Sequence, residues 1–180
     1  MKENIKLVKE NTLNLANSNV FVINEYQENL QFDYLAIIEK TLTELLKIAP
    51  CPKAEKFEFS IKLSTNEEVH FLNKEYRGKD CPTNVLSFEE DLDDDFIDLQ
   101  EELAEDNFTY IGDIIFAIPV VIAQAEDQNK TLENHFTHLV AHSILHIFGF
   151  DHIDDQDREE MESLEIEILK KLNIDDPYIL

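Results

Sequence analysis

The chain has 180 residues, enough for one domain with a sizeable core and too few for two domains of usual size. Hydrophobic residues make up 43% of it and include twelve phenylalanines, a composition that excludes an intrinsically disordered protein. The net charge of -24 argues against broad attachment to nucleic acid or to an anionic membrane. The composition therefore predicts a single acidic globular domain.

Three observations favour a cytoplasmic protein without a membrane partner. The N-terminal segment has neither an apolar stretch nor a small-residue cleavage site, so we expect no secretory signal. Cys51 and Cys81 form no CxxC pair, which favours free thiols in a reducing compartment over the alternative of a disulfide. The longest apolar run, 114–123, contains Pro119 and is about half a bilayer span. We assign this run to the core.

In chain order, residues 1–18 are polar, and we expect an N-terminal extension before a single domain at 19–180. Apolar residues recur at helical spacing in 32–48 and alternate with polar ones in 57–63. Strands are expected at 19–24, 56–64, 83–88 and 110–118. Helices are expected at 32–48, 119–129, 131–148 and 154–171, and a further helix is expected to run from a cap at 64–66 to about residue 76. This order predicts an α+β, or mixed α/β, fold in which helices pack on a small mixed sheet.

Residues 89–108 contain eleven acidic side chains and no basic one. A block of like charge repels itself and stays extended, so we interpret the segment as a solvated loop between two strands. A docking segment for a basic partner is the alternative.

Three of the six histidines fall in "HSILHIFGFDH", residues 142–152. His142 and His146 lie one helical turn apart on one face, and Gly149 stands where a helix commonly ends in a left-handed residue. His152 can then return toward the same point. Three imidazoles suit zinc and leave its fourth position open, as in catalytic sites. The spacing predicts one zinc ion per chain, zincin-like, against the alternative of ordinary surface and cap histidines.

His138 and Ser143 qualify this prediction. His138, one turn before His142, can be a fourth ligand or a packing and hydrogen-bonding neighbour, and we favour the second role. Ser143 occupies the position of the glutamate that takes a proton from the metal-bound water in zinc proteases. Serine at its ordinary pKa cannot do this, so the sequence points away from proteolysis. A metal ion can still activate water for attack on a substrate that carries its own negative charge.

Three segments together resemble one known family. "HLVAHSILHIFGFDH" (138–152), "LNKEYRGKDCPTNVLSF" (72–88) and "IGDI" (111–114) resemble the YbeY family of bacterial rRNA maturation factors, also described as metal-dependent endoribonucleases. The segments occur in the family's order across roughly 20–172. The resemblance implies a mixed sheet with helices around a zinc site.

Site residues follow from this resemblance by position. It implies that His142, His146 and His152 are the zinc ligands and that Arg77 is the basic catalytic residue beside the metal. It also suggests cleft or supporting roles for Ser87, Asp113 and Asp151, where Asp151 orients a ligand histidine. The chain departs from the family pattern at Ser143, where glycine is usual, at Phe150, where tyrosine is usual, and at Glu89, where proline is common.

We therefore predict a zinc-dependent endoribonuclease that acts in rRNA maturation, ribosome biogenesis and ribosome quality control. Metal-activated water attacks a phosphodiester and Arg77 stabilises the developing charge. The expected partners are rRNA or other RNA, and ribosomal proteins or the small ribosomal subunit, but not DNA. Two rivals stay open: a metal-dependent hydrolase of a peptide or small phosphoester, and a ribosome assembly factor with a mainly structural zinc.

Overall fold

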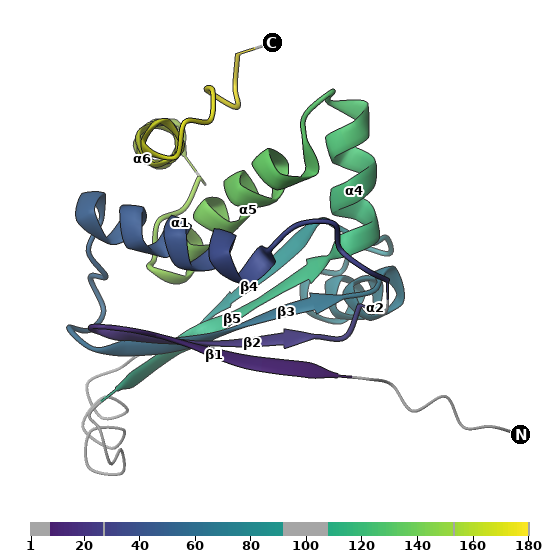
Figure 1. The fold of residues 1–180 in the computed structure, drawn as a ribbon, viewed down its shortest axis with the longest axis horizontal. Coiled ribbons are helices and arrows are strands. Elements are labelled where there is room, and N and C mark those ends of the chain that lie inside the picture. Colours follow the sequence, from purple (N-terminus) through teal and green to yellow (C-terminus); the bar gives the residue numbers. More distant parts are fainter. Residues whose placement is uncertain (1–7, 27, 92–107, 153, 180) are drawn as a thin grey trace, which may run out of the picture.

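The computed structural model describes residues 8–26, 28–91, 108–152 and 154–179. Five strands form one mixed sheet in the order β1-β2-β3-β5-β4 (Figure 1). β2 and β3, and β3 and β5, are parallel, whereas β1–β2 and β4–β5 are antiparallel. The strands are β1 (Lys9–Leu15), β2 (Ser18–Asn24), β3 (Phe57–Ser64), β4 (Val85–Glu89) and β5 (Thr109–Ala117). The predicted α+β fold is confirmed.

The first strand departs from the expected N-terminal extension at 1–18. Residues Lys9–Leu15 form β1, which pairs with β2 along its whole length, so the domain begins before residue 19. β1 is an edge strand whose side chains are exposed or half-buried, and its asparagines have low strand propensity. The apolar pattern of a central strand is therefore missing from this segment.

Helices cover the two faces of the sheet unequally. α1 (Tyr34–Ile48) and α5 (Leu132–Ile147) pack on one face, and α6 (Asp155–Lys171) packs on both of them. α2 (Asn66–Arg77) packs on β4 and β5 from the other face, while α4 (Ile118–Asp127) follows β5 directly. None of the helices in these described ranges is long and apolar enough to cross a membrane.

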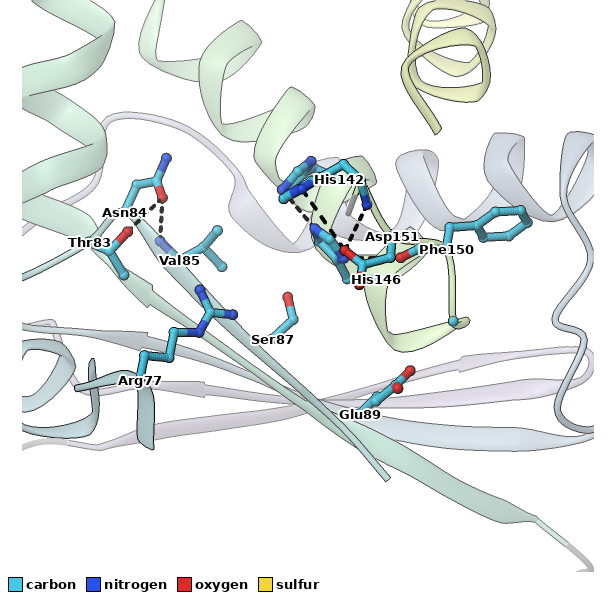
Figure 2. A pocket seen from close by; sticks show the side chains of 12 residues that line it. Arg77, Thr83, Asn84, Val85, Ser87, Glu89, His142, His146, Phe150 and Asp151 are labelled. Carbon is cyan, nitrogen blue, oxygen red and sulfur yellow. Dashed lines mark hydrogen bonds and ion pairs between the residues drawn. The ribbon is translucent and has the colours of Figure 1, made fainter. Parts of the chain in front are cut away.

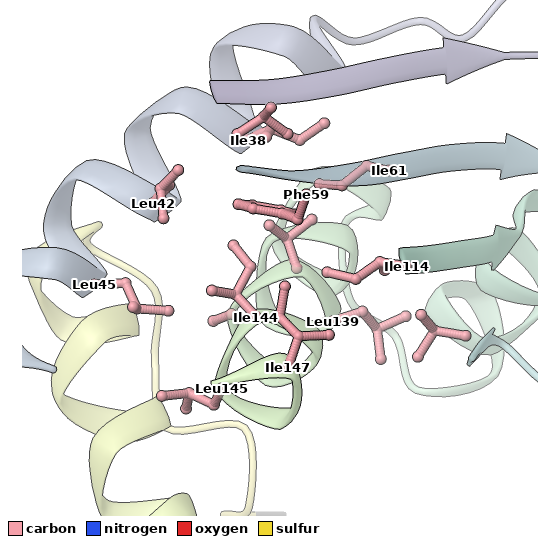
Figure 3. Close-up of a cluster of buried hydrophobic side chains, with 14 of the residues drawn as sticks. Ile38, Leu42, Leu45, Phe59, Ile61, Ile114, Leu139, Ile144, Leu145 and Ile147 are labelled. Carbon is pink, nitrogen blue, oxygen red and sulfur yellow. The ribbon is translucent and has the colours of Figure 1, made fainter. Parts of the chain in front are cut away.

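The main core lies between the sheet and α1 and α5 (Figure 3). Alternate residues of β3 point into it, as the period-two pattern predicts, and Phe59 and Ile61 are fully buried. Leu42 of α1 and Ile144 of α5 meet them from the helical layer. α5 is buried along most of its length, so the sheet fixes the position of the helix that carries the histidines.

A bulge in β5 brings β4 close to its neighbour. The β3–β5 register shifts between Glu58 and Ser60, which leaves an extra residue in β5 near Gly112. Gly112 has a φ of 145°, and a Cβ built there would lie 2.3 Å from the carbonyl oxygen of Phe88. Only glycine allows this approach, which sets the position of the end of β4.

The acidic segment predicted at 89–108 lies mostly outside the described residues. Glu89 ends β4, and the nitrogen of Glu90 donates to the carbonyl oxygen of Ile111, which prolongs the pairing with β5. Lys53 Nζ lies 3.3 Å from Glu89 Oε2 and 3.1 Å from the carbonyl oxygen of Glu90. The start of the segment is therefore tied to the chain between α1 and β3.

Candidate metal centre and cleft

α5 aims two histidines at one point. The helix starts at Thr131, whose hydroxyl accepts from the nitrogen of Asn134, and it runs without interruption to Ile147. His142 and His146 sit one turn apart, and their Nε2 atoms are 3.2 Å from each other. His152 adds a third nitrogen, and one ligand atom from each of the three histidines lies within 4.8 Å of the others.

The turn after α5 brings His152 back. Gly149 has a φ of 97°, and its nitrogen donates to the carbonyl oxygen of His146 at 2.9 Å. The nitrogen of Phe150 donates to the carbonyl oxygen of Leu145 at 3.0 Å, which completes the hydrogen-bond pair of a Schellman helix end. The predicted role of Gly149 as helix terminator is confirmed.

A carboxylate that sequence reasoning missed supports His142. Glu165 of α6 is only 1% exposed, and its Oε1 accepts from His142 Nδ1 at 2.8 Å while its Oε2 accepts from His138 Nε2 at 2.7 Å. His146 donates its Nδ1 proton to the carbonyl oxygen of Phe150 at 3.0 Å. With both Nδ1 atoms engaged, the Nε2 atoms of His142 and His146 are the ones left for a ligand.

The charges of this network suit a cation. Burial alone would raise the pKa of Glu165, but the hydrogen bonds from His138 and His142 lower that pKa to about 2. Burial lowers the pKa of His146 to about 4, and the neighbouring His142 acts in the same direction. At neutral pH Glu165 is therefore an anionic carboxylate and His146 is a neutral imidazole, and metal binding requires a histidine ligand in this neutral form.

The three histidines fit a zinc ion. Two nitrogens bound tetrahedrally at about 2.0 to 2.1 Å lie roughly 3.3 Å apart, which the separation of His142 and His146 already matches. His138 is not part of this set, because its Nε2 is used to donate to Glu165. Of the two roles weighed for His138, the supporting one agrees with this geometry.

A cleft of about 430 Å³ opens beside the histidines. Its other walls come from the end of α2, from β4 and from the turn after α5. It is lined by Arg77, Thr83, Asn84, Val85, Ser87, Glu89, His142, His146, Gly149, Phe150, Asp151 and His152. In Figure 2 Ser87 lies between Arg77 and the histidines. The edge strand β4 thus forms the floor of the cleft between Arg77 and the candidate metal site.

Arg77 stands at the opposite end of the cleft from the histidines. It is the last residue of α2, is exposed, and is followed by Gly78 in a left-handed conformation. Its guanidinium makes no ion pair or hydrogen bond within the described part of the chain. An unpaired planar guanidinium in a polar cleft is suited to hold an anionic group such as a phosphate.

Comparison with known proteins identifies the family of this chain. The sequence profile of the family described as "Endoribonuclease YbeY" matches residues 21–173. The chain belongs to the YbeY endoribonuclease family. Endoribonuclease YbeY of Acinetobacter baumannii ATCC 17978 is 46% identical over 143 residues, covering 79% of this chain and 83% of the relative. The Colwellia psychrerythraea protein of the same name is 44% identical over 137 residues, covering 76% and 81%.

A solved structure shares the fold. The solution structure of TM1509 from Thermotoga maritima has a TM-score of 0.50 and 22% sequence identity, and it covers 83% of this chain and 96% of that protein. This likeness concerns the arrangement of the chain. The range that the YbeY profile matches, 21–173, spans the positions of the three histidines and of Arg77 and ends before the C-terminal residues of the present structure.

Asp113 lies apart from this YbeY-type cleft. It sits on β5 opposite Phe88, on the sheet face that α2 partly covers, and its carboxylate accepts from Tyr110 Oη at 2.7 Å and also from the hydroxyl of Ser60. The bulge at Gly112 turns Ile111 and Ile114 toward the core and leaves Asp113 on the other face. Asp113 is thus not among the residues that line the cleft, and its suggested cleft role stays a prediction.

Two further predictions are refined. Asp151 lines the cleft, but its Oδ1 accepts from the backbone nitrogen of His152 at 2.7 Å and lies 3.9 Å from His152 Nδ1, so it shapes the turn rather than the imidazole. Ser143 is fully buried, and its hydroxyl donates to the carbonyl oxygen of Leu139. The residue in place of a protease glutamate therefore faces the core.

The sequence does hold a signal for Glu165. The buried residues of α6 are Met161, Glu165, Ile168 and Leu169, the i, i+4, i+7, i+8 stripe of an amphipathic helix. A glutamate at an apolar position of such a stripe indicates a buried partner. The many other acidic residues of α6 hide this signal when the helix is read by composition.

Proposed function

We propose that this protein is a zinc-dependent endoribonuclease that acts in rRNA maturation, ribosome biogenesis and ribosome quality control. The observation that carries the proposal is the single cleft in which Arg77, without an ion-pair partner among the described residues, faces the converging Nε2 atoms of His142 and His146. Membership of the YbeY endoribonuclease family supports it.

Each residue has a role that its position permits. His142, His146 and His152 would hold the zinc ion, and Glu165 and the Phe150 carbonyl keep two of the imidazoles aimed at it. A bound zinc ion supplies Lewis-acid chemistry and activates water at neutral pH. Arg77 holds two oxygens of the phosphodiester and stabilises the charge that develops there. Ser87, between them, offers a hydroxyl to the same phosphate.

The acidic body limits how this cleft binds RNA. With a net charge of -24, phosphate attraction is confined to the cleft, because nonspecific affinity for nucleic acid comes from lysine and arginine. We therefore include basic ribosomal proteins, or the small ribosomal subunit, as partners that contact the acidic surface and bring RNA to Arg77 in the cytoplasm.

The test compares RNA cleavage by the zinc-loaded wild type, Arg77→Ala, His142→Ala and Lys47→Ala. Arg77→Ala is expected to lower kcat/KM by about 10²- to 10³-fold, as for loss of one charge-stabilising donor. His142→Ala is expected to lose the activity because the ion is no longer held. Lys47→Ala removes the same charge from α1, where Lys47 pairs with Glu44, and is expected to cleave like the wild type.

The same variants separate the rival functions. Rescue of ribosome assembly in cells that lack the protein is measured alongside cleavage. Full rescue by Arg77→Ala, which keeps the three histidines but does not cleave RNA, together with no rescue by His142→Ala, would show an assembly factor with a structural zinc. Hydrolysis of a peptide or a small phosphoester that exceeds RNA cleavage and depends on His142 would identify a hydrolase of another substrate.

A further inference from the structure

The C-terminal tail reaches back to the support of the metal site. The hydroxyl of Tyr178 donates to Glu165 Oε2 at 2.5 Å, and its ring packs edge-on against His138 with 5.7 Å between ring centroids. The tail is held in this place by Lys130, whose Nζ donates to the carbonyl oxygen of Pro177 at 3.2 Å. Tyr178 lies beyond the residues that the family profile matches, 21–173.

Glu165 is therefore held from both of its oxygens. Its Oε2 accepts from His138 and Tyr178, and its Oε1 accepts from His142. A carboxylate with one donor can rotate about its last bond, whereas donors on both oxygens leave it one orientation. Glu165 is 1% exposed, so loss of one of these donors leaves a buried carboxylate oxygen with fewer hydrogen-bond partners in the protein.

We propose that Tyr178 is a positioning residue for the metal centre, which acts through Glu165 to hold the His142 imidazole with its Nε2 toward the cleft. The inference rests on the metal site of the proposed function. It adds a residue outside the cleft, and it gives the C-terminal tail a role in the affinity for the ion. Tyr178 touches neither the ion nor the substrate.

A small cavity supports this position. About 260 Å³ lies behind the histidines, and Tyr178 borders it together with His142, His152 and Glu165. Tyr178 is 43% exposed, so substitution there does not open the core. Tyr178→Phe keeps the ring over His138 and removes only the hydroxyl, so it tests the hydrogen bond separately from the packing.

The experiment measures zinc affinity of the full chain by competition with a chelator of known affinity. Tyr178→Phe is expected to weaken zinc binding about threefold to tenfold, and Glu165→Gln, which changes the direct partner of His142, about 10- to 100-fold. The matched control is Tyr110→Phe. It removes the same kind of bond, from a tyrosine to the carboxylate of Asp113 on the other face of the sheet, and is expected to leave zinc affinity unchanged.

A second readout does not depend on zinc. In the apoprotein, NMR of the His142 Nδ1 proton reports the bond to Glu165, and Tyr178→Phe is expected to speed its exchange with solvent while Tyr110→Phe does not. In the Glu165→Gln background, Tyr178→Phe is expected to have less effect on zinc affinity than it has in the wild type.

The outcomes separate this inference from the proposed function. A wild-type protein that binds no zinc overturns the metal site itself. A wild type that binds zinc, with Tyr178→Phe equal to it in affinity and in proton exchange, overturns only the role of Tyr178. An equal loss of affinity in the wild-type and Glu165→Gln backgrounds shows that Tyr178 does not act through Glu165.

Discussion

His142 and His146 are supported in different ways. A carboxylate accepts from Nδ1 of His142, and a backbone carbonyl accepts from Nδ1 of His146. A carboxylate partner makes the imidazole a more basic ligand than a carbonyl does, while the carbonyl of Phe150 belongs to the same turn that carries His152. The orientation of His142 thus depends on α6, and the orientation of His146 depends on the turn after α5.

Replacement of a ligand predicts loss of the metal. The native protein is expected to contain one zinc ion per chain and His146→Ala to contain much less than one, measured by elemental analysis after gel filtration. His70→Ala is the control, because His70 pairs with Asp80 on the surface and is not part of the histidine cluster. Native protein purified without chelators and found free of metal would contradict the site.

At the residue scale, sequence spacing predicts the positions of site residues that are close in the chain, but not of those that the fold brings together from distant segments. The histidines and Gly149 lie within one helix end, so their geometry follows from helical periodicity and turn chemistry. Arg77 enters the cleft because α2 ends beside β4, which the resemblance implied and the residues alone did not show. The sheet face of Asp113 could not be predicted either, because the bulge at Gly112 changes the strand alternation of β5.

Among the elements, the β4–β5 pair is the one whose spacing depends on a single glycine. Gly112 lets β4 approach, and the odd-numbered residues of β4, among them Ser87, then face the cleft. α2 closes the other side of this pair with Val69 and Leu72. Gly112 bears no catalytic side chain, but it thus sets the distance from the floor of the cleft to the histidines.

Two glycine substitutions test this constraint. Gly112→Ala is expected to lower the free energy of unfolding by about 3 kcal/mol or more, because strain at its φ is joined by contact with the Phe88 carbonyl. Gly78 has a φ of 67°, but no atom lies within 4 Å of a Cβ built there. For Gly78→Ala we therefore expect the free energy of unfolding to fall by roughly 1 to 2 kcal/mol. Urea unfolding measures both. Equal losses would show that backbone strain alone matters.

Element boundaries were predicted well where a face is buried. The predicted strand 110–118 is observed as Thr109–Ala117, and the predicted helix 154–171 as Asp155–Lys171, since apolar periodicity and caps mark both. β1 left no comparable mark, because an edge strand needs few apolar residues to be held by backbone hydrogen bonds.

For the whole molecule, the negative net charge confines the expected RNA contact to the cleft that contains Arg77. Arg77 is the one lysine or arginine among the described residues that line the cleft. A protein of net charge -24 with a single cleft cation has little capacity for an extended phosphate track.

Salt dependence measures the number of phosphate contacts. For a single-stranded RNA oligonucleotide bound in the presence of a chelator, we expect the slope of log affinity against log salt concentration to be no steeper than about −2. Arg77→Ala is expected to make it shallower by about 0.7. Lys47→Ala is expected to leave the slope unchanged. A slope much steeper than this would reveal a basic surface outside the cleft.

The order of the strands also affects how the protein folds. β4 lies between β3 and β5 in the chain but outside them in the sheet, so β3 and β5 pair only after the chain between them has looped out. Contacts between distant segments form slowly, because long loops lose conformational entropy on closing. The helix end and turn that carry the three histidines lie within residues 142–152. Their distance from Arg77, in contrast, depends on the pairing of β3 with β5. Refolding protein is therefore expected to regain metal capture before it regains the complete cleft.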